Sequence, residues 1–193
     1  MRIIGGHDRG RRLRAPRGLR TRPTADRVRE ALFDVLGPAV AGARVLDLFA
    51  GTGAVGIEAL SRGAARVVLV ERDPSALRAL RANLTALGAS RAAARVLAGD
   101  VLRVLADLGA QEGPFDLVFL DPPYATTLAA RTLQALGATG VCRNGTEVVV
   151  QHSTRIELPA VPDLVAHRRP RRFGDSALTF FRAEEYTPDG SRP

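Results

Sequence analysis

Short apolar runs alternate with longer amphipathic stretches along the chain from residue 44 onward. The runs are rich in Val and Leu with few polar interruptions, which is typical of strands buried on both faces of a parallel sheet. The stretches between them place apolar residues at helical spacing. The pattern therefore predicts an α/β fold with a mostly parallel sheet covered by helices on both faces. Strands are expected at 44–50, 65–71, 94–99, 115–121 and 146–153, and helices at 51–63, 73–88, about 101–109 and about 127–137.

The last part of the chain departs from this alternation. Residues 164–172 and 177–182 are joined by Gly174-Asp175, a pair that is typical of a tight hairpin turn. These two segments bring the expected sheet to seven strands and give it a C-terminal antiparallel hairpin. Residues 187–193 are expected to be a disordered tail, as the ends of chains often are.

The first part of the chain is basic rather than apolar. Residues 1–23 are rich in Gly and Arg and contain few large apolar side chains, which predicts a short basic hairpin or arm. The segment PTADRVREALFDVLGP (23–38) predicts a helix that Thr24 caps and that Gly37-Pro38 ends. We therefore expect a small N-terminal extension over residues 1–38 and one α/β domain over residues 39–186.

Composition excludes several classes of protein. A single cysteine, Cys142, excludes an intramolecular disulfide framework, and His7, His152 and His167 are too far apart in sequence to suggest a zinc site. No metal is therefore expected. No apolar run reaches the length of about 18 residues that a membrane span needs. The basic N-terminus has no apolar stretch behind it, so no secretory signal is expected and the protein is predicted to be cytoplasmic.

The charge is strongly basic and unevenly distributed. The net charge is +8, and all 28 basic residues are arginine, which a compositional bias alone would explain. However, residues 1–36 contain ten arginines against four acids, so +6 of the total lies there, and a second cluster, HRRPRR, occupies residues 167–172. Clustered arginine indicates binding to a phosphate backbone, whereas the alternative is a solvated arginine-rich surface.

A glycine-rich motif follows the first predicted strand. Gly51, Gly53 and Gly56 form a G-x-G-x-x-G pattern at the start of a helix, and Glu71 follows the next strand, 20 residues after Gly51. Glycines let a ligand approach the backbone, and a carboxylate after the second strand accepts hydrogen bonds from ribose hydroxyls. The pattern fits both a nicotinamide dinucleotide and S-adenosylmethionine (SAM).

Two further carboxylates favour SAM. Asp47, at the carboxyl end of the first strand, would repel a pyrophosphate but suits the cationic methionine end of SAM. Asp100, after the third strand, can accept a hydrogen bond from the adenine amino group. The alternatives are a loop or helix-capping role for Asp47 and an N-cap role for Asp100.

The stretch DPPY (Asp121, Pro122, Pro123 and Tyr124) follows the strand FDLVFL, so Asp121 is expected at the ligand-binding edge of the sheet with Asp47, Glu71 and Asp100. A carboxylate and the Pro122 carbonyl, held still by the two prolines, can accept both hydrogens of a planar exocyclic amine and direct its lone pair at an electrophilic methyl group. Tyr124 offers a ring on which an extruded base can stack. Alternatively, DPPY is an ordinary proline-rich turn.

Together these motifs resemble a known family. The chain resembles the RsmD family of bacterial small-subunit rRNA guanine-N2 methyltransferases over nearly its whole length. The glycine loop and DPPY are shared by many amino-methyltransferases, whereas the opening segments are more specific. The resemblance rests on MRIIGG (1–6), RPTADRVREALFDVL (22–36), DLFAGTGAVGIEALSRGA (47–64), DPPY (121–124) and RRFGDSALTFFR (171–182).

The resemblance implies a Rossmann-like SAM-dependent methyltransferase fold and a set of site residues. SAM is expected at Asp47, Gly51, Thr52, Gly53, Glu71 and Asp100, and DPPY matches the family's catalytic motif. The segment that contains Arg22, Thr24 and Arg27 is expected near the methionine end of SAM or the target base. The alternative for this segment is that Thr24 is a plain N-cap and that Arg27 and Arg29 lie on a solvated helix face.

The resemblance also implies the partner. The substrate is expected to be one guanine of 16S rRNA, in the 30S subunit or an assembly intermediate, and the enzyme a monomer. Other substrates of a DPPY amino-methyltransferase, namely DNA adenine, another RNA or a protein amide, remain alternatives, as does a non-catalytic rRNA-binding assembly factor. Contacts with rRNA are expected from Arg9, Arg11, Arg12, Arg22, Arg168, Arg169, Arg171 and Arg172.

Overall fold

A computed structural model describes residues 1–15, 23–123 and 127–184, with only the backbone of residues 23–25 described. The chain forms two compact units, Met1–Val101 and Leu102–Pro193. The N-terminal extension expected over residues 1–38 lies within the first of these units. The expected domain limits themselves remain a prediction.

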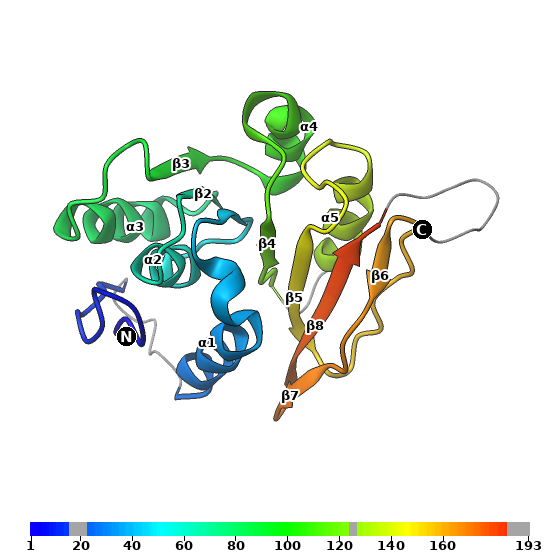
Figure 1. The fold of residues 1–193 in the computed structure, drawn as a ribbon, viewed down its shortest axis with the longest axis horizontal. Coiled ribbons are helices and arrows are strands. Elements are labelled where there is room, and N and C mark those ends of the chain that lie inside the picture. The colour runs from blue at the N-terminus through cyan, green and yellow to red at the C-terminus, as the bar shows by residue number, and fades with distance from the viewer. Residues whose placement is uncertain (16–22, 124–126, 185–193) are drawn as a thin grey trace. The chain divides into compact units, whose positions relative to one another are not determined.

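The first unit contains three parallel strands and the helices between them (Figure 1). β2 lies in the middle, with β1 on one side and β3 on the other; Val45 pairs with Val67, and Leu69 with Val96. The Val and Leu side chains of β2 are fully buried, as the continuous apolar run predicts. The elements are α1 (Pro23–Leu36), a 3-10 turn η1 (Gly37–Val40), β1 (Arg44–Asp47), α2 (Ala54–Ser61), β2 (Arg66–Glu71), α3 (Pro74–Ala86) and β3 (Ala94–Ala98).

The start of α1 differs from the prediction. Thr24 was expected to cap the helix, but the helix begins at Pro23, so Thr24 lies in its first turn. Proline suits this position because its missing N–H is one that the first turn leaves without a helical partner. In α3, by contrast, Asp73 is an N-cap, and its side chain accepts a hydrogen bond from the Ala76 N–H at 2.7 Å.

An N-terminal hairpin, residues 1–14, precedes α1. Arg2 and Arg12 form an antiparallel bridge, and the Ile3 N–H donates to the Arg11 carbonyl at 3.0 Å. Ile3 and Leu13 are buried, whereas Arg9, Arg11 and Arg12 are exposed. The expected basic hairpin is therefore present, and two apolar side chains anchor it while its arginines face solvent.

The second unit combines a parallel pair with an antiparallel extension. β4 and β5 are parallel; β8 is antiparallel to β5, and both β6 and β7 pair with β8. Its core includes Phe115, Leu120 and Phe180, all fully buried. The elements are α4 (Val101–Glu112), which starts at the boundary, β4 (Leu117–Leu120), α5 (Leu128–Gly137), β5 (Glu147–Ser153), β6 (Leu164–Ala166), β7 (Arg171–Phe173) and β8 (Ser176–Ala183).

The C-terminal hairpin is confirmed, with one difference. The single strand expected over 164–172 is interrupted between β6 and β7, so the described residues form eight strands rather than seven. Pro170 lies in the interruption and has no N–H to donate to a neighbouring strand. Within the described residues, no helix combines the length and apolarity that crossing a membrane requires, and no group of His, Cys, Asp and Glu side chains is arranged to hold a metal ion.

Candidate functional site

The glycine loop joins β1 to α2 in the first unit. Gly51 and Gly53 have φ angles of +54° and +84°, a region that side chains other than glycine rarely adopt. A Cβ atom at Gly53 would lie 2.3 Å from Leu80 Cδ1, whereas a Cβ at Gly51 would meet nothing within 4 Å. The loop is therefore packed tightly against α3 at Gly53 and open at Gly51, where a ligand can approach the backbone.

Glu71 ends β2 and is bound to this loop. One carboxylate oxygen, Oε2, accepts a hydrogen bond from the Gly51 N–H at 2.7 Å, and the other accepts from the N–H groups of Arg72 and Asp73 at 2.7 and 2.8 Å. A carboxylate offers about four lone-pair sites, so acceptor capacity remains after these three bonds. Glu71 can therefore accept one further hydrogen bond, from a ribose hydroxyl beside the glycine loop.

Asp47 and Asp100 lie at the ends of their strands, as expected, but in different surroundings. Asp47 is 1% exposed, and its Oδ2 accepts a hydrogen bond from the Gly56 N–H at 3.2 Å. This side chain therefore braces the glycine loop against the start of α2. Asp100 is half-exposed, directly precedes α4, and lies 3.7 Å from Arg72 Nη1 in an ion pair.

These first-unit residues fit SAM. Open space at a glycine with positive φ provides an approach to the backbone, and Glu71 provides a fixed acceptor for ribose hydroxyls. Thr52 lies between the two glycines, and its carbonyl accepts a hydrogen bond from Asn83 Nδ2 at 3.0 Å. Direct contact of Asp47 and Asp100 with the cofactor remains a prediction.

Asp121 follows β4 in the second unit. It is half-buried, and burial raises the pKa of its carboxyl to about 7. Pro122 is buried and Pro123 is exposed, while Tyr124 lies outside the described residues. A carboxyl group with this pKa can accept hydrogen bonds from the N–H groups of an amine substrate. It can also take up, near neutral pH, the proton that such an amine releases.

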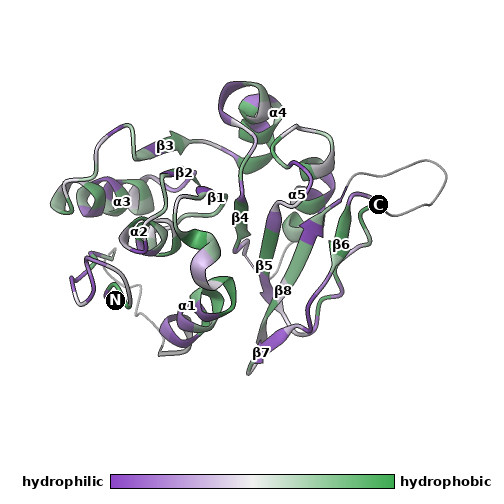
Figure 2. Cartoon of the chain, viewed as in Figure 1, coloured by the Kyte–Doolittle hydropathy of each residue, from purple (hydrophilic) through white to green (hydrophobic). Residues whose placement is uncertain are grey.

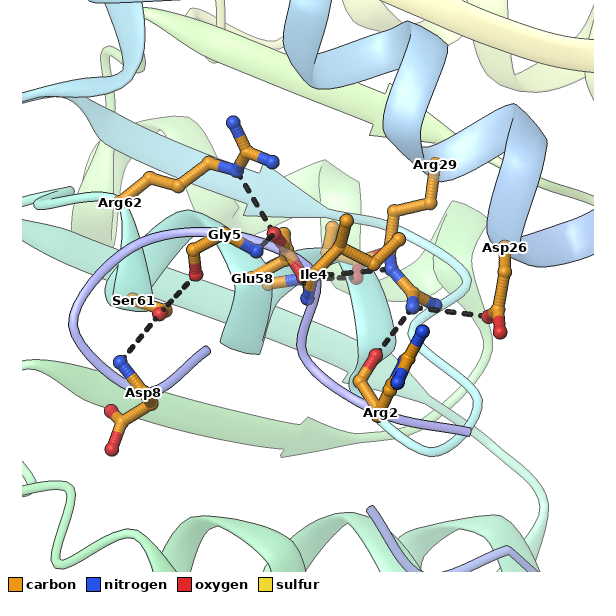
Figure 3. A network of polar contacts seen from close by, with 11 residues as sticks. Arg2, Ile4, Gly5, Asp8, Asp26, Arg29, Glu58, Ser61 and Arg62 are labelled. Atoms are coloured by element: carbon orange, nitrogen blue, oxygen red, sulfur yellow. Dashed lines mark hydrogen bonds and ion pairs between the residues drawn. The ribbon is translucent and has the colours of Figure 1, made fainter. Parts of the chain in front are cut away.

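A buried polar network, not predicted from the sequence, holds the N-terminal hairpin on α2 (Figure 3). Glu58 is fully buried and accepts hydrogen bonds from the N–H groups of Ile4 and Gly5 at 2.8 and 2.7 Å and from Arg62 Nε at 2.9 Å. Ser61 adds a second contact: its hydroxyl accepts from the Asp8 N–H at 3.0 Å and lies 2.6 Å from the Gly5 carbonyl.

Arg29 joins α1 to the same network. Its Nη2 donates to the Arg2 carbonyl at 2.7 Å and to Asp26 at 3.1 Å, and its Nε lies 3.7 Å from a Glu58 oxygen. The side chain is only 4% exposed, so the alternative that Arg29 lies on a solvated helix face is wrong. A sequence signal was lacking, because Arg29 and Glu58 occupy ordinary helical positions, and their contacts with each other and with the hairpin form only in the folded chain.

Arg27 is exposed and lies with the hairpin arginines. Together with Arg2, Arg9, Asp26 and Glu30 it lines a cavity of about 270 Å³, which includes none of the other expected SAM residues. Arg12 lines a larger cavity of about 670 Å³ that shares Arg2, Gly10 and Asp26 with the first. The structure therefore brings Arg9, Arg12 and Arg27 to one basic surface.

The remaining expected RNA contacts are distributed as follows. Arg11 pairs with Asp8 at 2.6 Å and donates to the Ala86 carbonyl at 2.5 Å, so it also attaches the hairpin to α3. Arg22 lies outside the described residues, and of Thr24 only the backbone is described. In the second unit, β7 is hydrophilic and its partner β8 largely hydrophobic (Figure 2). Four exposed arginines lie on or beside β7: Arg168, Arg169, Arg171 and Arg172.

Comparison with known proteins gives a consistent result. The family model named Conserved hypothetical protein 95 matches residues 1–182. The chain is similar to ribosomal RNA small subunit methyltransferase D of Escherichia coli, with 39% identity over 95% of this chain and 90% of that protein. It is also similar to the protein of the same name from Haemophilus influenzae, with 42% identity over 70% of each chain.

Solved structures agree in fold. The protein yhhF from Escherichia coli matches with a TM-score of 0.84 and 40% identity, covering 95% of this chain and 98% of that one. A Thermus thermophilus protein matches with a TM-score of 0.80 and 38% identity, covering 95% and 99%. The agreement extends over the α/β core and the C-terminal antiparallel strands.

Proposed function

The chain belongs to the RsmD family of SAM-dependent small-subunit rRNA methyltransferases, and from that premise we propose that it methylates the exocyclic N2 amine of one guanine in 16S rRNA. The observation that supports this assignment best is that the chain has both an open glycine loop, hydrogen-bonded to Glu71, and a half-buried Asp121 in a DPPY motif. The glycine loop suits SAM, and Asp121 suits an amine.

In this proposal the first unit holds SAM. Gly51, Thr52 and Gly53 present the loop backbone to the cofactor, and Glu71 accepts a hydrogen bond from a ribose hydroxyl. Asp47 holds the loop through its contact with Gly56 and is assigned to the cationic methionine end of SAM. Asp100 is assigned to the adenine amino group. When bound, SAM supplies a methyl group that is activated by the adjoining sulfonium.

Asp121 and the Pro122 carbonyl hold the guanine amine. The amine lone pair is delocalised into the ring, so accepting both N–H hydrogens orients the nitrogen and increases its electron density during transfer. After the methyl group is transferred, the nitrogen carries an extra proton, which passes to the Asp121 carboxylate or to water. Burial raises the pKa of Asp121 to about 7, so its carboxylate is a competent acceptor for this proton. Tyr124 is assigned to stacking on the extruded base.

Binding to rRNA is assigned to the two basic surfaces. Arg9, Arg12 and Arg27 lie together on the first unit, and the β7 arginines lie on the second. Arginine forms paired hydrogen bonds with phosphate oxygens, and most of such binding is independent of sequence. We assign residues 1–38 to the rRNA and SAM side of the enzyme, and we propose that it acts as a cytoplasmic monomer on the 30S subunit or an assembly intermediate.

Substitution of Asp121 tests this function. Asp121→Ala is expected to abolish methyl transfer to 30S subunits and leave SAM affinity nearly unchanged, because Asp121 is assigned to the amine and not to the cofactor. Transfer is measured with labelled SAM, and affinity by calorimetry. Full activity of the variant would refute the mechanism.

A different amine substrate is the main alternative, because DPPY motifs serve several amines. Mass spectrometry of rRNA from a strain that lacks the gene separates the two assignments. Loss of one N2-methylguanine from 16S rRNA supports the proposal, whereas an unchanged rRNA modification pattern indicates another substrate. A non-catalytic assembly factor would bind rRNA and transfer no methyl group at all.

A further inference from the structure

Asn83 on α3 contacts both the N-terminal hairpin and the glycine loop. Its Oδ1 accepts a hydrogen bond from the Arg14 N–H at 2.7 Å, and its Nδ2 donates to the Arg14 carbonyl at 3.1 Å. The same Nδ2 donates to the Thr52 carbonyl at 3.0 Å. One side chain therefore joins the end of the basic hairpin to the loop assigned to SAM, although these residues are 31 and 69 positions from Asn83 in sequence.

The amide group is chemically suited to this place. Towards Arg14 it presents an acceptor and a donor, as the backbone of a neighbouring strand would, and its second N–H binds Thr52. Asn83 is 2% exposed, so water does not replace these partners easily when they are lost. Aspartate has nearly the same shape but would direct a carboxylate oxygen, which cannot donate, at the carbonyls of Arg14 and Thr52.

We propose that Asn83 is a positioning residue that couples rRNA binding by the N-terminal hairpin to SAM binding by the glycine loop. This inference rests on the proposed function, because it takes the hairpin as an rRNA contact and the loop as the SAM site. A shift of Arg14 on rRNA binding is transmitted through one amide to the Thr52 carbonyl, between the two glycines of positive φ. Coupling is reciprocal, so each ligand raises the affinity for the other by the same factor.

The Glu58 network provides a matched comparison. It attaches the hairpin at Ile4 and Gly5 and involves Arg29 and Arg62, but none of its contacts is made with Gly51, Thr52 or Gly53 (Figure 3). A variant such as Glu58→Gln therefore disturbs hairpin docking without changing a contact of the glycine loop. The hydrogen bonds of Asn83 differ from this network because they reach both segments.

The test measures the affinity for S-adenosylhomocysteine, the product of methyl transfer, by equilibrium dialysis with and without saturating unmethylated 30S subunits. In the wild-type protein, 30S subunits are expected to tighten binding of this product by about tenfold, within the usual range of coupling between two sites. Asn83→Ala and Asn83→Asp are expected to weaken product binding in the absence of RNA and to reduce the coupling factor to about one. Glu58→Gln is expected to weaken binding of 30S subunits and to leave product affinity of the free protein unchanged.

The outcomes are distinguishable. Product affinity in both Asn83 variants equal to that of the wild type, or a coupling factor that persists in them, would overturn the proposal. Asn83→Asp keeps the side-chain volume, so it remains informative if Asn83→Ala fails to fold, and thermal denaturation of each variant identifies a general loss of structure. If the wild-type protein binds product but not 30S subunits, the rRNA assignment fails, while the measurement without RNA still tests the contact of Asn83 with the loop.

Discussion

Asp121 is assigned to binding a polar amine, yet its carboxyl group is partly removed from water. Its carboxyl group follows the buried strand β4 and is itself half-buried, which disfavours the charged form and raises its pKa to about 7. The folded pKa lies above the unfolded value of 3.8, so the free energy of unfolding falls as the pH rises from about 3.8 to about 7, because over this range the unfolded state loses the proton that the folded state keeps. We infer that the position of Asp121 favours function at a cost in stability.

The same pKa predicts a pH dependence of catalysis. Below about 7 Asp121 is protonated and accepts the amine hydrogens poorly, so kcat/KM should rise about tenfold per pH unit up to about 7 and level off above it. The measurement is kcat/KM for 30S subunits at constant ionic strength across this range. Asp121→Asn, which does not ionise, should show residual activity without this rise. A wild-type kcat/KM that is flat or falls between pH 6 and about 7 would contradict the assigned role.

Substitutions at two glycines of the glycine loop are expected to separate effects on ligand binding from effects on the free energy of unfolding. At Gly51 a Cβ atom meets nothing within 4 Å, so Gly51→Ala should cost only the backbone strain of φ +54°, about 1–2 kcal/mol, while blocking the ligand. At Gly53 a Cβ would also lie 2.3 Å from the buried Leu80, adding about 1–3 kcal/mol of overpacking. Gly53→Ala should therefore unfold at lower denaturant than Gly51→Ala.

Calorimetry with SAM completes this comparison. Gly51→Ala should retain its fold and lose at least about tenfold in SAM affinity, since an added methyl group occupies space that the ligand needs. Asp34→Asn, on the exposed face of α1, is a suitable control for a change remote from the loop. Unchanged SAM affinity in a folded Gly51→Ala protein would show that the ligand does not approach the loop at this residue.

The C-terminal hairpin gives a prediction about rRNA. Arg171 and Arg172 are exposed on β7, opposite Leu178 and Ala177 of β8. Replacing both by alanine should reduce the slope of log affinity against log salt by about 1.4–1.8, if each arginine neutralises one phosphate. SAM affinity and thermal stability should remain unchanged. Arg103 is exposed on α4, so Arg103→Ala serves as the control. An equal loss of rRNA affinity in that variant would show that the β7 arginines contribute no more to rRNA binding than another exposed arginine.

For the molecule as a whole, the sequence predicted those features that depend on local pattern. Continuous Val and Leu runs predicted the buried strands, and the glycine spacing predicted a loop between β1 and α2 with Glu71 at the end of the next strand. The hydrogen bond between Gly51 and Glu71 was not predicted. Local rules were less successful at element ends. Pro23 rather than a capping Thr24 begins α1, and Pro170 divides one expected strand into β6 and β7.

The contacts that hold the hairpin in place were beyond sequence analysis for a physical reason. Glu58, Arg29 and Asn83 are polar residues in helices, and polar side chains normally face solvent. They are buried here because the hairpin covers them and supplies backbone partners that lie 27 residues from Arg29, 53 and 54 from Glu58, and 69 from Asn83 along the chain. The spacing of residues within a helix cannot predict a hydrogen-bond partner so far away along the chain.

The proposed activity is tested by mapping the base that receives the methyl group. The purified protein is incubated with labelled SAM and with either 30S subunits from a strain that lacks the gene or naked 16S rRNA, and the modified nucleoside is then mapped by mass spectrometry. We expect N2-methylguanosine at one position of 16S rRNA, and none with Asp121→Ala. Label on another base, on a protein, or on no component of the 30S subunit or the naked rRNA would contradict the proposed activity.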